Sequence, residues 1–163
     1  MNRRSFAAGL ALAVLAVLGL AGPAAAGDQV PFRGQFDGTV TATPINPPLF
    51  AILVEGEGHA SHLGRFTVSV PHLVDRSTRL ASGTYVFTAA NGDTLTAEFT
   101  GQSFPTDTPG VLYIVENATV TGGTGRFAGA TGGFTVERLF DTAAGTTTAA
   151  IDGTVSSVGA SNH

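Results

Sequence analysis

Cysteine and lysine are absent from the chain, and charged residues make up only 12% of it. Without cysteine there is no disulfide and no thiolate chemistry, so the folded domain must be held together by its core. Residues 27–163 contain six arginines and all twelve acidic residues, which gives a formal charge of −6, and no basic stripe. Such a chain repels phosphate backbones, and we expect no nucleic-acid partner.

The common catalytic motifs are also missing. There is no Gly-x-Ser-x-Gly elbow, no His-Glu-x-x-His zinc motif and no phosphate-binding loop. Three histidines and no cysteine in the expected folded region leave little from which to build a nucleophilic triad. The sequence favours a non-enzymatic role but does not decide whether the domain is an enzyme. It predicts no cofactor and no metal.

The N-terminus has the three-part layout of a secretory signal. Arg3 and Arg4 precede an apolar run from Phe6 to Leu20, Pro23 breaks the run, and Ala24–Ala26 offers small residues to a signal peptidase. We therefore expect cleavage after residue 26 and one secreted or periplasmic domain, residues 27–163, without a membrane span.

Two alternatives concern the same segment. A membrane anchor needs roughly 20 apolar residues, and this run is shorter. Arg3-Arg4-Ser5-Phe6 matches part of the twin-arginine export motif, so the export route is either general secretory or twin-arginine.

Beyond residue 30, apolar and polar residues alternate in short runs between turn signals, which is typical of strands. We expect Pro44–Pro48 and Pro71 to end strands, and loops at His72–Ser82 and Phe104–Gly110. The predicted strands are Gly34–Thr43, Leu49–Ala60, Gly64–Val70, Gly83–Ala90, Asp93–Gly101, Val111–Thr121, Gly132–Asp141 and Thr147–Ser156.

Eight antiparallel strands in an all-β domain predict a barrel or a β-sandwich. Few charges protect strand edges here, and closure removes edges, so we favour a single eight-stranded antiparallel β-barrel. Asn91-Gly92 lies between two alternating runs and predicts a two-residue type I′ hairpin turn, with positive φ at Gly92.

Val120–Gly132 is rich in glycine, with five glycines in eleven residues from Gly122. Glycine permits sharp bends and close backbone approach, so the segment predicts a compact connection anchored by Phe127.

This segment resembles the glycine-rich turn of dirigent proteins and allene oxide cyclases, in which Gly-Gly-Thr-Gly-x-Phe, a small residue and glycine join two strands. The resemblance covers Val111–Phe140. It implies an eight-stranded antiparallel barrel, often trimeric, with a lumen for small apolar or phenolic molecules. No catalytic residue of that family can be matched onto this chain.

Glu55, Glu57 and His59 are spaced two apart on one predicted strand and share a face, where they could bind a ligand or act as acid and base. The opposite face looks packed, which favours solvent exposure of the three. His62 would join His59 only if the strand bends near Ser61, which argues against a metal site.

Glu116 and Arg138 each interrupt an apolar stripe, on strands that the glycine segment would join. Buried charges need partners, so we expect an ion pair between residues roughly opposite each other. The pair is either a structural salt bridge or the polar floor of a ligand-binding lumen. Arg76, Arg79 and Arg126 are expected to be solvated surface charges.

Three functions remain open from the sequence. The domain could bind a small apolar molecule, act as an isomerase or cyclase of allene-oxide-cyclase type, or serve as a structural envelope protein. A cavity of ~300 Å³ or more with convergent polar groups would favour a ligand, whereas a barrel filled by Phe and Val would favour a structural role.

Overall fold

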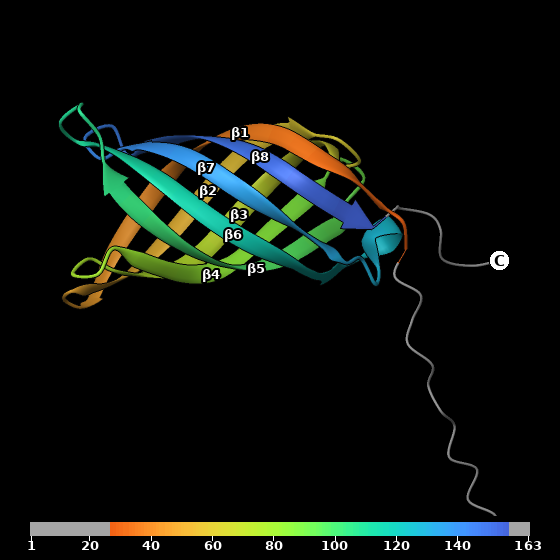
Figure 1. The fold of residues 1–163 in the computed structure, drawn as a ribbon, viewed down its shortest axis with the longest axis horizontal. Coiled ribbons are helices and arrows are strands. Elements are labelled where there is room, and N and C mark those ends of the chain that lie inside the picture. Colours follow the sequence, from red (N-terminus) through yellow and green to blue (C-terminus); the bar gives the residue numbers. More distant parts are fainter. Residues whose placement is uncertain (1–26, 157–163) are drawn as a thin grey trace, which may run out of the picture.

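The computed structural model describes residues 27–156, which form a closed barrel of eight antiparallel strands and one short 3-10 helix (Figure 1). Each strand pairs with its neighbours in sequence, and β1 closes the barrel against β8. The elements are β1 (Gln29–Asn46), β2 (Leu49–Ala60), β3 (Gly64–Asp75), β4 (Leu80–Ala89), β5 (Thr94–Pro105), β6 (Val111–Gly123), η1 (Gly125–Phe127), β7 (Gly132–Asp141) and β8 (Thr146–Ser156).

The predicted barrel is confirmed, and the sandwich alternative is wrong. The predicted signal at residues 1–26 lies outside the described residues and stays a prediction. No helix within residues 27–156 is both long and apolar enough to cross a membrane.

Pro44 and Pro71 do not themselves end strands, although β1 does end at Asn46, within the predicted boundary Pro44–Pro48. β1 continues through Pro44, because it pairs with β8 only as far as Thr39 and has an unpaired side from there on. β3 continues through Pro71, which pairs with Leu53 of β2, while the β3–β4 pairing is interrupted between Ser69 and His72.

Three predicted boundaries are therefore wrong. β3 runs on to Asp75, β4 begins at Leu80, and β5 reaches Pro105. Most of the predicted loop His72–Ser82 is therefore strand, whereas in Phe104–Gly110 only Phe104 and Pro105 are. In addition, β1 begins at Gln29, five residues before its predicted start.

The hairpin between β4 and β5 is also wider than predicted. Gly92 has the expected positive φ of 89°, but among non-glycine residues of the described part only His62 and Arg79 share that conformation, so Asn91 does not form a type I′ turn. The connection spans residues 90–93, with the N–H of Gly92 donating to the carbonyl of Ala89 at 2.9 Å.

The barrel has two unlike halves. We call the half that ends in the β2–β3, β4–β5 and β6–β7 connections the closed half, and the half that ends in the other four hairpins the open half. Figure 1 shows η1 across the end of the closed half, where β8 also ends.

Aromatic side chains fill the closed half. Ring centroids lie 4.9–6.1 Å apart, mostly edge to face, an arrangement worth about 0.5–1.5 kcal/mol per pair beyond burial. Phe127 of η1 is fully buried in the same cluster, which confirms it as the anchor of the glycine segment. The rings in contact belong to Phe32, Phe66, Tyr85, Phe87, Phe99 and Phe134.

Candidate functional site: a cavity with a polar floor

The open half of the barrel is hollow. It holds a cavity of about 600 Å³, within the usual range for sites that bind small molecules. Inward positions here have smaller and mostly aliphatic side chains, whereas aromatic rings occupy the closed half. The apolar walls come from Val40, Ile52, Val74, Leu112, Ile114 and Phe140.

Glu116 of β6 and Arg138 of β7 form the floor of the cavity, with 0% and 3% of their surface exposed. Nη2 of Arg138 donates to Oε1 of Glu116 at 2.5 Å, and Nε donates to Oε2 at 3.0 Å. Both prongs of the guanidinium are matched to one carboxylate, the strongest geometry for such a pair. The predicted ion pair is thus confirmed.

The strand register offsets the two residues. Glu116 lies opposite Val136, and Arg138 lies opposite Ile114, so the two residues, predicted to be roughly opposite each other, form a diagonal pair. Long side chains on neighbouring strands reach across such a diagonal.

Tyr85 of β4 completes the ion pair by donating its hydroxyl hydrogen to Oε2 of Glu116. Burial raises the pKa of Tyr85 well above its usual value, and the charge of Glu116 adds to this, so the hydroxyl stays protonated. Burial alone would lower the pKa of Arg138, but Glu116 reverses the direction and raises it. The carboxylate is therefore well satisfied, and the floor has no net charge.

His72 of β3 also faces the cavity and is 8% exposed. Its Nδ1 lies 2.9 Å from the carbonyl oxygen of Val70, which can only accept, so Nδ1 holds the hydrogen. Burial lowers the pKa of His72, and the positive charge of Arg138 lowers it further, against an opposing effect of the Val70 hydrogen bond. The imidazole is therefore neutral near pH 7, with a lone pair on Nε2.

Two glycines leave room for these polar side chains. A Cβ at Gly101 would lie 2.6 Å from Cγ of Glu116, and one at Gly83 would lie 2.3 Å from Cβ of His72. Neither distance is compatible with packed carbon atoms. The floor therefore depends on glycine at the facing positions of β5 and β4.

Arg76 and Arg79 lie at the mouth of the cavity. Both are exposed, as the sequence predicted. The Arg76 guanidinium also stacks over the ring of Phe50, 3.6 Å from its centroid. The mouth is thus positively charged, in contrast to the neutral floor.

Glu55, Glu57 and His59 share the outer face of β2 and are all exposed, as their spacing predicted. They do not line the cavity with Glu116 and Arg138, so the five candidate residues form two separate groups. Within residues 27–156, no three histidine, aspartate or glutamate side chains come together as a metal site.

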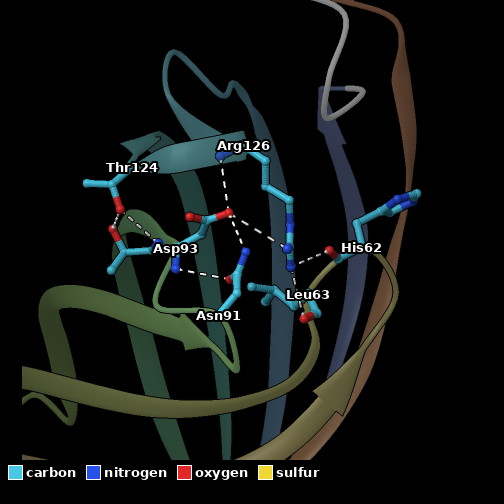
Figure 2. A network of polar contacts seen from close by, with 7 residues as sticks. His62, Leu63, Asn91, Asp93, Thr124 and Arg126 are labelled. Carbon is cyan, nitrogen blue, oxygen red and sulfur yellow. Dashed lines mark hydrogen bonds and ion pairs between the residues drawn. The ribbon is translucent and has the colours of Figure 1, made fainter.

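Arg126 is exposed, as we expected, but its guanidinium also makes specific contacts (Figure 2). Its Nη2 donates to the carbonyl oxygens of His62 at 3.1 Å and Leu63 at 3.2 Å, and Nη1 lies 3.7 Å from Oδ2 of Asp93. Hydrogen bonds from Asn91 and from the backbone N–H of Arg126 lower the pKa of Asp93. This network links all three connections at the closed end.

Two residues were not among the predicted site residues: His72, which lines the cavity, and Tyr85, which donates to Glu116. The signal for His72 was an alternation from Phe66 to Val74 that continues through Pro71, which we read as a strand end. Tyr85 shares its inward face with Phe87 and Ala89 on β4, but nothing in that pattern marks its hydroxyl as a partner of Glu116.

Comparisons with family models, curated proteins and solved structures return no match for this chain. The resemblance to dirigent proteins and allene oxide cyclases, and the trimer that it implies, therefore stay predictions. Function has to be inferred from the site itself.

Proposed function

We propose that this chain is an exported binding protein that holds a small, mainly apolar molecule in the open half of its barrel. Export rests on the predicted signal. The observation that supports binding is the cavity of about 600 Å³, with apolar walls and a few polar groups gathered at its floor. That combination is the usual character of a small-molecule site.

The contrast between the two halves supports the same function. A barrel of eight strands is narrow enough for side chains to fill it, as the rings of the closed half do. The open half instead leaves aliphatic walls uncovered. An apolar ligand would remove that surface from water, at roughly 25 cal/mol per Å².

Retention of a ligand tests this function directly. Protein purified after export should release a small molecule under denaturing mass spectrometry, and emptied protein should bind the neutral apolar dye Nile red. Ala42→Trp, which projects a large ring into the cavity, should abolish dye binding. Ala150→Trp places the same ring on the exposed face of β8 and should not. Equal dye binding by both variants, or none by the parent, would favour the structural alternative.

An isomerase is the second candidate, and His72 is the observation that favours it. Glu116 is held by three donors and is poorly placed to take a proton, whereas Nε2 of neutral His72 is a base within the cavity lining. Arg138 beside it could polarise a carbonyl oxygen. Proton exchange next to the carbonyl of dodecanone in D₂O, followed by NMR, should then require His72 and be lost in His72→Gln.

A further inference from the structure

The cavity floor contains hydrogen-bond donors that the protein does not use. Arg138 uses Nε and Nη2 for Glu116, and its Nη1 makes no hydrogen bond within residues 27–156. No buried side-chain nitrogen or oxygen in that same range lacks a partner, so Nη1 is not sealed in the core. Because Arg138 lines the cavity, its remaining N–H groups are available to a molecule there.

The floor also contains an unused acceptor. Nδ1 of His72 donates to Val70, which leaves the lone pair of Nε2 as the second polar atom of the ring. Nε2 has no protein partner in the described part of the chain, and by the same reasoning it is not sealed in the core. His72 and Arg138 both line the same cavity, so one bound molecule can meet both side chains.

The unused donor of Arg138 and the unused acceptor Nε2 of His72 determine which polar group of a ligand fits the cavity floor. A hydroxyl can accept from Arg138 and donate to His72 at the same time. A carboxylate cannot donate to Nε2, and it would add a negative charge next to Glu116. An ammonium group cannot accept from Arg138, and it would bring a second cation to a neutral floor.

We propose that the ligand is an aliphatic alcohol, bound with its hydroxyl on the floor between Arg138 and His72 and its chain along the walls of the open half. This inference rests on the proposed function, and names the class of molecule for the same cavity. Apart from Phe140, the apolar walls are aliphatic, which fits such a chain.

Displacement of Nile red from the full mature chain tests the proposal. The competitors are n-dodecanol, methyl dodecyl ether and dodecanoate, which share a chain and differ in the polar end. The alcohol should displace the dye at a roughly tenfold lower concentration than the ether, because the ether leaves Nε2 of His72 unpaired. Dodecanoate should also be weaker than the alcohol.

Substitution of His72 separates recognition from folding. His72→Leu should weaken n-dodecanol roughly tenfold and leave the ether unchanged, whereas His72→Gln keeps an acceptor oxygen and should keep the preference. Glu57→Gln on the outer face of β2 is the matched control and should behave as the parent.

The outcomes distinguish a failure of the proposed binding function from a failure of the proposed ligand class. If the parent does not bind the dye, the binding function itself fails. If it binds the dye but no competitor displaces it, the assignment to an aliphatic alcohol is wrong. If alcohol and ether compete equally, or if His72→Leu keeps the preference, the cavity binds apolar chains but the hydroxyl assignment is wrong. If dodecanoate binds best, the arginines at the mouth and not the floor select the ligand, and the proposal is overturned.

Discussion

Replacing Arg138 by methionine tests the ion pair at the cavity floor. Methionine has a similar volume and no charge, so the change removes the partner of Glu116 without opening a large cavity. Tyr85 remains as a donor to the carboxylate. The variant thus isolates the cost of a buried charge without its counter-ion.

The expected loss follows from the burial of Glu116, which is fully inaccessible. Breaking a buried pair by removing one partner costs roughly 3–5 kcal/mol. A carboxyl without a counter-ion can escape this cost by taking up a proton, which at pH 7 costs an ordinary carboxyl about 4 kcal/mol. Both routes predict a similar loss in the free energy of unfolding. Uptake of a proton also predicts that this loss shrinks by about 1.4 kcal/mol per pH unit on acidification.

A double-mutant cycle measured by denaturant titration provides the assay. The cycle contains Arg138→Met, Glu116→Leu and the double variant, each at pH 7 and pH 5. We expect strong coupling, with the double variant close to the parent in its free energy of unfolding, because no charge is left alone. Coupling near zero, or single losses of at most about 1 kcal/mol, is the behaviour of an exposed pair and would refute the buried floor.

Three further predictions follow from single positions. Gly92→Val should lower the free energy of unfolding by about 1–2 kcal/mol, because valine is strained at a φ of 89° where nothing else crowds the site; Gly92→Asn should cost less, and a melting temperature of Gly92→Val equal to the parent would contradict the turn. His72 should make the domain less stable as the pH falls below about 6.5, because the unfolded chain binds the proton first and the buried ring resists it. The stability lost between pH 7 and 5 should therefore be smaller in His72→Gln, and an unchanged slope would mean that His72 is accessible to water. Exported protein should begin at Gly27, and N-terminal sequencing that found Met1 would contradict the signal.

The barrel could be predicted from the sequence because alternation at period two survives in every strand. In β6, for example, Leu112, Ile114, Ala118 and Val120 face inward while Asn117 faces out, and that pattern holds without knowledge of the partner strands. The same alternation exposed Glu116 and Arg138 as charges on an inward face, which is why their pairing could be predicted.

Details that depend on strand pairing could not be read from the sequence. Pro44 and Pro71 are compatible with strands only because a neighbouring strand is missing or unpaired beside them. The two-residue offset of Glu116 and Arg138 follows from the register of β6 with β7. The hydrogen bonds from Arg126 to His62 and Leu63 form only because three connections meet at one end of the barrel. Each is a property of the closed barrel and not of a local segment.

The position of the ion pair supports a role beyond stability. An apolar pair of the same volume would stabilise the floor at least as well, because the attraction within a buried salt bridge does little more than offset the cost of desolvating its two charges. The pair lies where the packed rings of the closed half give way to the cavity, and it leaves N–H groups of Arg138 available there. The double variant Glu116→Leu with Arg138→Met should therefore stay folded yet bind n-dodecanol and its methyl ether both more weakly, because the oxygen of each accepts from Arg138. A stable double variant that bound both molecules as tightly as the parent would show that the pair serves only the fold.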